Sequence, residues 1–330
     1  MSKRIRWVDY GKGFAIFLVI FGHVALGSLE SKNFTGNDAL ILHYFIEATY
    51  AIHIPVFFAL SGYFFKPLTH FQTIGQRIYK RIISLGVPYV IFSVIMVLLK
   101  LAGGGAVRNQ DGLKGLLNIY WQPIDYLWFL YALFFVDIFM SLLSLTVKSR
   151  TITVVILIAL FIFDSSFHFG IPAIEYICLW TPFYYLGYLL RGIKIPRWLA
   201  WWSFILYVIH VPVFCTFCPN QVFLSGYWRI ISVFAVVMMF YFFSHHQGFD
   251  TRFIEWCGLG SIELYLVHAP VLSVIRIALF KLGVSNLFLQ LSVQFAIGVL
   301  SSLLVLWFAG RFNFVNFIFR PFPYFNKRSK

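Results

Sequence analysis

The first apolar stretch of the chain, DYGKGFAIFLVIFGHVALG, carries three ionisable side chains. They are Asp9, Lys12 and His23. An ionisable side chain costs at least a few kcal/mol near the centre of a bilayer, so each one needs a structural or chemical reason. Imidazole is the side chain whose unperturbed pKa suits general-base catalysis near neutral pH. His23 is therefore the first residue predicted to do chemistry.

Lys12 and His23 are spaced to share one face of a helix. Eleven residues at about 100° each bring them within roughly 20° of one another, about 16 Å apart along the axis. That face would carry a cation near the cytoplasmic boundary and an imidazole near the outer boundary. The alternative is structural: Asp9 and Lys12 pair at the membrane boundary, where Lys12 reaches for water, and His23 hydrogen-bonds a neighbouring helix.

A second histidine follows in the segment AIHIPVFFALSGYFFKP. If this segment enters the membrane from outside, His53 lies at about the depth of His23. We predict that His53 is catalytic as the orienting partner of His23. The alternative is an interfacial histidine that hydrogen-bonds a backbone carbonyl. Pro55 leaves such a carbonyl without its helical donor, because proline lacks an N–H group.

Three cations cluster where the next apolar segment begins, in RIYKRIISLGVPY. Arg77, Lys80 and Arg81 fall on nearly one side of a helix start. Guanidinium groups bind phosphates bidentately, so these residues, with Lys12, are predicted to bind a phosphate-bearing cofactor. The alternative is anchoring at the cytoplasmic boundary, where Lys and Arg accumulate in any membrane protein.

Two further groups are predicted to bind substrate. Glu263, Tyr265 and His268 lie in one apolar segment, and a glutamate inside a membrane is typically functional, although pairing with a cation such as Arg276 explains it equally well.

Tyr126 and Trp128 lie near an outer boundary. Their rings suit stacking on a sugar, but aromatic residues also gather at membrane interfaces for anchoring.

The elements that must position these residues are membrane-spanning helices. Hydrophobic residues make up 60% of the chain and charged residues 12%, which is far from the composition of soluble domains. Segments of about 20 apolar residues span a hydrocarbon core roughly 30 Å thick. We predict an all-α polytopic membrane bundle of about ten helices, as one domain over 1–330 without a soluble appendage. The predicted spans are 8–27, 47–65, 78–101, 124–146, 151–165, 173–190, 198–217, 228–243, 260–280 and 287–310.

The basic residues predict an orientation with both termini inside. Of the 26 Lys and Arg residues, about 18 fall in inner segments and about 6 in outer loops, while Lys12 and Arg276 lie inside spans. This distribution faces anionic lipid of the inner leaflet and excludes nucleic acid as a partner, because no separate basic domain is present.

The four cysteines lie within or beside apolar segments and lack the spacing of a metal site, so we predict packing roles and no metal. Cys215 and Cys218 form a C-x-x-C pair that leaves a disulfide open. The first apolar stretch lacks a small-residue cleavage site, which indicates a retained helix and not a signal peptide.

Six segments, in order, resemble the acyltransferase 3 family of multi-pass membrane proteins, in particular its fucose 4-O-acetylase-like branch. The first is a basic residue and a histidine, Lys12 and His23, with ten residues between them, and Lys12 stands where much of the family has arginine. The others are His53–Phe65, the basic segment from Arg77 through Arg81 to Pro88, YLWFL at Tyr126–Leu130, FYYLGYLL at Phe183–Leu190 and GSIELYLVH at Gly260–His268.

The resemblance implies an O-acyltransferase that uses acetyl-CoA or another acyl-CoA as co-substrate. The acceptor would be a sugar hydroxyl of a cell-surface or lipid-linked polysaccharide, and the location would be the plasma membrane, as in a bacterial inner or cytoplasmic membrane. In this interpretation His23 is the general base and the basic residues hold the acyl-CoA phosphates. A transient acyl-imidazole on His23 is an equal alternative.

Two other functions fit a polytopic chain. A transporter or flippase of a lipid-linked glycan would favour paired, broken half-helices in the two halves of the sequence. A structural subunit of a polysaccharide-export complex would not need His23.

Overall fold

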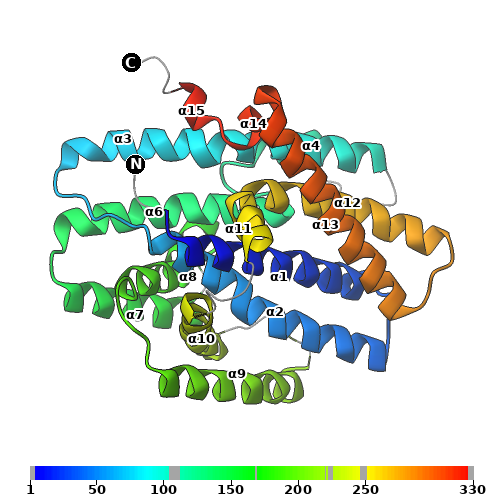
Figure 1. Ribbon diagram of the computed structural model, residues 1–330, viewed down its shortest axis with the longest axis horizontal. Helices are drawn as coiled ribbons and strands as arrows, with labels where there is room; N and C mark the ends of the chain where they lie inside the picture. Colours follow the sequence, from blue (N-terminus) through cyan, green and yellow to red (C-terminus); the bar gives the residue numbers. More distant parts are fainter. Residues whose placement is uncertain are drawn as a thin grey trace. The chain divides into compact units, whose positions relative to one another are not determined.

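The computed structural model describes residues 4–103, 112–167, 169–219, 221, 226–245 and 251–325. Within these ranges every regular element is a helix. The α-helices are α1 (Arg6–Glu30), α2 (Asn37–Gly62), α3 (Ile74–Arg81), α4 (Val87–Gly103), α5 (Gly112–Leu117), α6 (Trp128–Thr146), α7 (Arg150–Ser166), α8 (Pro172–Leu189), α9 (Arg197–Phe217), α10 (Ile231–His245), α11 (Arg252–Leu259), α12 (Ser261–Lys281), α13 (Leu287–Arg311), α14 (Asn313–Phe319) and α15 (Phe322–Phe325). Figure 1 labels most of them.

Eight helical segments within the described residues are long and apolar enough to cross a membrane. The two other predicted spans, 151–165 and 173–190, coincide with α7 and α8. The chain is a multi-pass helical membrane protein, as its composition predicted. The eight segments are Arg6–Glu30, Asn37–Gly62, Phe71–Gly103, Asp125–Thr146, Arg197–Phe217, Gly226–His245, Ser261–Lys281 and Leu287–Arg311.

Two predicted boundaries were wrong. Helix α2 begins at Asn37, ten residues before the predicted start at 47. Its first turns carry Asn37, Asp38 and His43, so the apolar signal rises later than the helix does. The third span begins before residue 78, because a 3-10 turn, Phe71–Thr73, leads into α3.

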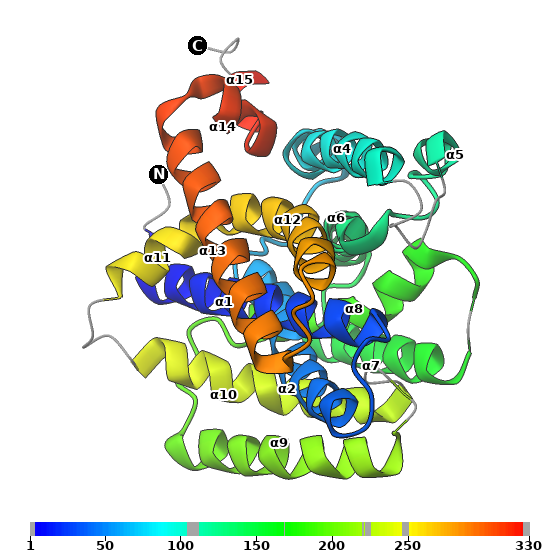
Figure 2. The ribbon, with the colours of Figure 1, turned by 90° about the vertical axis from the view of Figure 1, so that its right-hand side faces the viewer.

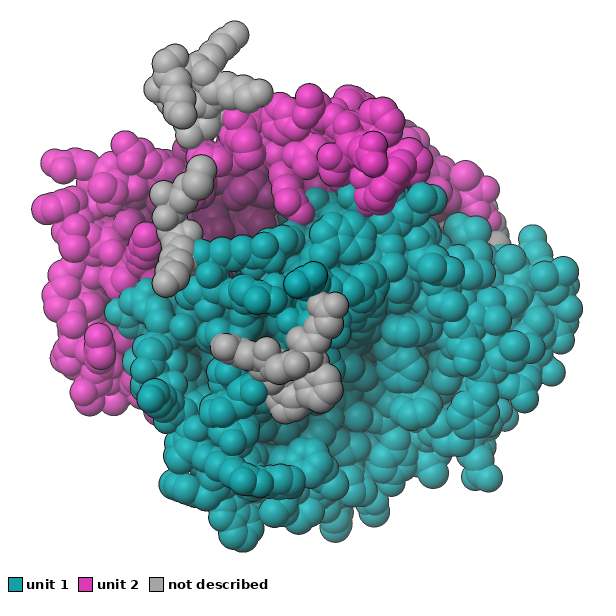
Figure 3. Space-filling view, in the orientation of Figure 1, with its two compact units in different colours: residues 1–63, 186–306 teal, residues 64–185, 307–330 magenta. Residues whose placement is uncertain are grey.

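The described chain divides into two compact units, which Figure 3 distinguishes by colour. Unit 1 comprises Met1–Tyr63 and Leu186–Leu306, and unit 2 comprises Phe64–Tyr185 and Trp307–Lys330. The predicted histidines belong to unit 1, and the cations of the segment 77–81 belong to unit 2. The single acyltransferase domain predicted over 1–330 stays a prediction.

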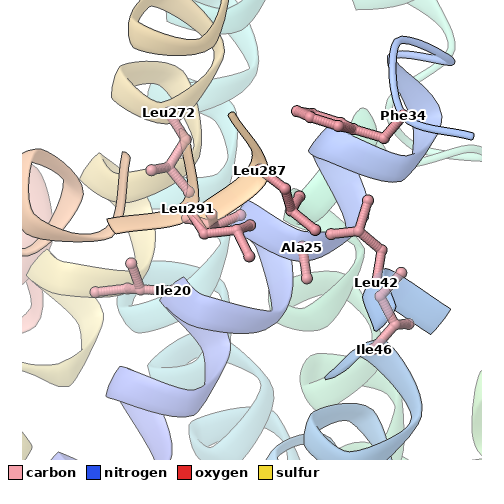
Figure 4. Close-up of a cluster of buried hydrophobic side chains, with 9 residues drawn as sticks. Ile20, Ala25, Phe34, Leu42, Ile46, Leu272, Leu287 and Leu291 are labelled. Atoms are coloured by element: carbon pink, nitrogen blue, oxygen red, sulfur yellow. The ribbon is translucent and has the colours of Figure 1, made fainter. Parts of the chain in front are cut away.

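Helix α1 is the centre of unit 1, where it packs against α2, α10, α11 and α12. Helices α9 and α10 run side by side (Figure 2). Near the C-terminal end of α1, apolar side chains from α1, the loop between α1 and α2, α2, α12 and α13 form one buried cluster (Figure 4). Because lipid is as apolar as these side chains, close packing stabilises such a cluster more than removal from water does. The buried members are Ile20, Val24, Ala25, Phe34, Leu42, Ile46, Leu272, Leu287 and Leu291.

Glycines allow α11 to approach the start of α1. A Cβ atom on Gly13 would overlap the backbone carbonyl of Ile254, and one on Gly258 would overlap the carbonyl of Asp9. Small residues permit such backbone contact between membrane helices. Lys12 therefore lies on a segment of α1 whose position is fixed by α11.

In unit 2, α3 continues into α4 through a π-helical turn, Ile82–Gly86. Pro88, near the start of α4, has no N–H to donate to the preceding turn, so a regular α-helical ladder cannot pass through it. The π turn directly follows Arg81, and π turns within helices are frequent at functional sites. Helix α6 packs against this region, and α14 packs on α4, where the Phe92 and Phe319 rings lie 5.6 Å apart.

The four cysteines are free in the structure, as packing roles predicted. Cys178, Cys215 and Cys257 are buried and Cys218 is half-buried. Cys215 and Cys218 are therefore not joined by a disulfide in this structure.

Candidate functional site

Histidines from three helices of unit 1 meet beside the C-terminal half of α1. Gly22 permits a close approach of α2, because a Cβ at this position would lie only 3.2 Å from Cε1 of His53 and 3.1 Å from Cε2 of Tyr50. The ring centroids of Tyr50 and His53 are 4.5 Å apart, and those of His23 and Tyr50 are 6.1 Å apart. His53 thus lies at the level of His23, as the hairpin between the two helices predicted.

The third histidine is His268, on α12. Its ring centroid lies 5.0 Å from that of His23, in an edge-to-face arrangement. The prediction for His268 was contact with substrate, and that role stays a prediction. What the structure adds is direct contact between His268 and the ring of His23.

Backbone hydrogen bonds fix the protonation of the two flanking imidazoles. Nδ1 of His53 lies 2.6 Å from the carbonyl oxygen of Thr49, and Nδ1 of His268 lies 3.1 Å from that of Leu264. A carbonyl oxygen only accepts, so each Nδ1 must carry the hydrogen. In the neutral ring, Nε2 is then left with its lone pair. Both flanking histidines are arranged to accept a proton or a hydrogen bond at Nε2.

Accessibility distinguishes His23 from its neighbours. His53 and His268 are 1% and 0% exposed, whereas residue His23 as a whole is half-buried. A general base must reach the proton that it removes. Of these three histidines, His23 is the least buried.

A guanidinium group lies one helical turn from His23 on the same side of α1. The Arg276 head group from α12 packs on Gly27 so closely that a Cβ there would overlap it. The Arg276 charge is within electrostatic range of His23. The histidine cluster therefore has a fixed positive charge beside it.

The other predicted residues of unit 1 lie on the same two helices. Lys12 is half-buried, about three turns before His23 on α1. Glu263 and Tyr265 are buried on α12, and the ring of Tyr265 lies 5.9 Å from that of His268. Asp9 is paired with Arg4 at 2.7 Å.

The predicted phosphate-binding cations of unit 2 converge on a residue that the motif analysis missed. Arg77 and Arg81 each bind the carboxylate of Asp137, on α6, through Nε and Nη2, at 2.7 to 2.8 Å. The hydroxyl of Tyr184, on α8, donates to the same carboxylate at 2.6 Å. Lys80 is exposed, and its ammonium lies over the ring of Phe322 at 5.4 Å.

The predicted sugar-stacking residues lie in another part of unit 2. Trp128 stacks with Tyr176 at 5.4 Å and with Trp180 at 5.7 Å, both on α8. Tyr126 is 4% exposed and follows Asp125, whose φ of +44° makes a sharp turn before α6. Substrate contact by Trp128 and Tyr126 stays a prediction.

Comparison of the chain with known protein families gives the same family as the six sequence segments. A family model described as an acyltransferase domain, that of the acyltransferase 3 family, matches residues 5–311. The chain belongs to this family. The match confirms the family predicted from the six segments, and with it the class of enzyme that the family name describes.

Two curated relatives of this acyltransferase 3 protein are similar over part of their length. The nodulation protein NolL of Mesorhizobium japonicum is 28% identical over 182 residues, which are 55% of this chain and 46% of the relative. NolL of Sinorhizobium fredii is 26% identical over 186 residues, 55% of this chain and 47% of the relative. The matched region thus spans about half of each relative. No solved structure gives a significant match.

A sequence signal existed for Asp137. Asp125 stands at the edge of the predicted span 124–146, whereas Asp137 lies in its interior, where a charge is costly unless it is paired. Its partners are 56 and 60 positions earlier in the chain. The pairing itself depends on the packing of α3 against α6, which no local pattern encodes.

Proposed function

We propose that the chain is a membrane-bound O-acyltransferase that moves an acyl group, acetyl in our proposal, from cytoplasmic acyl-CoA to a sugar hydroxyl. The acceptor would be a cell-surface or lipid-linked polysaccharide, and the location the plasma membrane of a bacterium. The observation that carries the proposal is the contact of His23 with the buried His268, close to the buried His53, in a chain of the acyltransferase 3 family.

In the proposed reaction, His23 acts as the general base. His268 is the proposed orienting partner: its ring lies 5.0 Å from that of His23, and its Nε2 would accept the N–H of His23 and direct the lone pair of His23 toward the sugar hydroxyl. His23 removes the hydroxyl proton while the oxygen attacks the thioester carbonyl. When the tetrahedral intermediate collapses, the coenzyme A thiolate leaves and takes the proton from the imidazolium, so the base is regenerated.

The tetrahedral intermediate carries a negative oxygen that needs stabilisation. The Arg276 guanidinium, packed on Gly27, supplies a fixed positive charge near His23. Donors that are already in place stabilise an oxyanion without reorganisation, and removing one typically costs about 100-fold or more in kcat. We assign this role to Arg276.

Acyl-CoA brings phosphates that cannot enter hydrocarbon. We assign them to Arg77, Lys80 and Arg81 of unit 2, whose side chains provide several N–H donors at the start of a helix. Lys12 is the remaining proposed contact. It stands about 16 Å from His23 along α1, a length that the pantetheine arm can span.

The direct test replaces His23 with Ala in cells that make the acylated glycan. Acyl esters on the surface polysaccharide, measured by mass spectrometry, should fall by about 100-fold or more because the base is lost. His70→Ala is the matched control, since His70 is exposed in the 3-10 turn region before α3. Unchanged esters in His23→Ala at normal protein level would refute the catalytic role and favour transport or an export-complex subunit.

A further inference from the structure

Asp137 is a buried carboxylate of unit 2 with several hydrogen-bond donors around it. Its side chain is 0% exposed and accepts five hydrogen bonds, four from Arg77 and Arg81 and one from Tyr184. A buried charge is tolerated only when it is paired and fully hydrogen-bonded. Here the pairing is complete, and it draws residues of α3, α6 and α8 to one point.

The carboxylate lies behind the two arginines. Its side chain is fully buried, whereas the side chains of Arg77 and Arg81 are 17% and 27% exposed. Each guanidinium has five N–H groups, and Asp137 occupies only the edge formed by Nε and Nη2. Arg77 also donates from Nη1 to the carbonyl of Lys66 at 3.4 Å. The remaining donors of the pair are directed away from Asp137.

The cluster keeps a positive charge. Two guanidinium groups and one carboxylate sum to +1, and exposed Lys80 is adjacent in the sequence. Without the carboxylate, the two guanidinium groups would repel each other at close range in a medium of low dielectric constant. Asp137 therefore allows both arginines to stand together and leaves a net attraction for anions.

We propose that Asp137, assisted by the hydroxyl of Tyr184, is a positioning residue that holds Arg77 and Arg81 together as a surface for the diphosphate of the acyl-CoA donor. The proposal rests on the proposed function, because it takes acyl-CoA as the donor. Asp137 does not touch the donor. It acts by fixing the spacing and direction of the two guanidinium groups, which the i, i+4 separation on α3 alone does not fix.

The test compares four variants of the full-length protein in detergent: Asp137→Asn, Tyr184→Phe, Arg77→Ala/Arg81→Ala and Glu255→Gln. Coenzyme A is titrated by calorimetry, and pantetheine, which lacks the nucleotide and its phosphates, is the comparison probe. Acyl transfer in membranes at varied acetyl-CoA gives KM and kcat. Glu255→Gln is the matched control, since Glu255 also holds two arginines, Arg4 and Arg6, but in unit 1.

Asp137→Asn should weaken coenzyme A binding and raise KM for acetyl-CoA by about tenfold or more, because an amide NH₂ faces the guanidinium donors where an oxygen is required. The kcat value should stay within about threefold, as expected when uniform binding is lost. Any pantetheine binding should not change. Glu255→Gln should leave KM unchanged, and Arg77→Ala/Arg81→Ala should raise it at least as much as Asp137→Asn.

Three results would overturn the positioning role. In Asp137→Asn they are an unchanged affinity for coenzyme A, a tighter affinity, or a fall in kcat at constant KM. A tighter affinity would mean that the Asp137 carboxylate competes with phosphate for the arginines. If Asp137→Asn does not fold, Tyr184→Phe tests the positioning role instead. Its KM for acetyl-CoA should rise by about threefold, and an unchanged KM would contradict the role. A wild-type protein that binds no coenzyme A would overturn the donor assignment as well. A loss of affinity in Arg77→Ala/Arg81→Ala alone would overturn only the role of Asp137.

Discussion

At the residue scale, the chemistry depends on which nitrogen of each imidazole carries a hydrogen. The backbone carbonyls of Thr49 and Leu264 place the hydrogen of His53 and of His268 on Nδ1. Both rings then present Nε2 as an acceptor. A histidine beside such acceptors, as His23 is, can be oriented as a base in the way that a carboxylate orients the base of a catalytic triad.

We predict that His268→Ala lowers kcat for acyl transfer by about tenfold to hundredfold, because His23 loses the acceptor that orients it. KM for acetyl-CoA should stay unchanged, since His268 is buried and makes no proposed contact with the donor. Steady-state kinetics in membranes measure both values, with His70→Ala as the control. An unchanged kcat would mean that His268 only fills space.

Glu255 lies on α11, outside the membrane-spanning segments. Its ion pairs are expected to make the stability of the fold depend on pH. Its hydrogen bond from Arg6 holds the pKa of this carboxyl below the ordinary 4.5, and Thr251 adds a second bond at 2.6 Å. A lowered native pKa stabilises the fold above pH 4.5, and that contribution is lost as the pH falls through the native value.

Thermal unfolding of wild type and Glu255→Gln measures this contribution. At pH 7 the wild type should unfold at the higher temperature, by the equivalent of about 1 kcal/mol, because the Arg6 side chain is largely exposed. The difference should shrink as the pH is lowered below about 4.5. A difference that is the same at pH 7 and at pH 3.5 would contradict the assignment.

At the element scale, glycines decide how α1 is held. Gly13 and Gly258 let the backbones of α1 and α11 touch, and Gly22 lets α2 bring His53 to the level of His23. These contacts fix α1, the helix that carries both Lys12 and His23. A side chain at such positions would move the helix and not merely fill a gap.

We predict that Gly258→Ala destabilises the protein by about 2 kcal/mol or more, because its Cβ would overlap the carbonyl of Asp9 and force α1 and α11 apart. Gly75→Ala is the control, since a Cβ there meets nothing within 4 Å on exposed α3, where alanine is the better helix former. Thermal unfolding in detergent compares the two. Equal midpoints would contradict the close contact.

The sequence predicted the elements better than it predicted their contacts. Apolar runs of sufficient length located the helices, because a span must satisfy its own backbone hydrogen bonds and exclude charge. The polar first turns of α2 and the π turn after Arg81 carry no such signal. The contacts of Asp137 with α3, and of His268 with His23, join residues far apart in sequence. They follow from helix packing, which periodicity does not specify.

At the scale of the whole molecule, transfer of an acyl group across the membrane would explain both the distribution of Lys and Arg residues and the histidines inside the spans. About three-quarters of the Lys and Arg residues outside the spans fall in segments that are predicted to face the cytoplasm, where acyl-CoA is made. The proposed acceptor is on the outer side. A protein that joins the two must carry chemistry inside the membrane, and the histidine cluster of unit 1 lies within predicted spans.

The most direct test uses inverted membrane vesicles from cells that express the protein, with acetyl-labelled acetyl-CoA supplied on the exposed cytoplasmic side. The quantity measured is base-labile label transferred to the glycan fraction. We predict transfer with wild type and His70→Ala, and about 100-fold less or none with His23→Ala. Equal label in His23→Ala and wild type, or no label in wild type, would contradict the account.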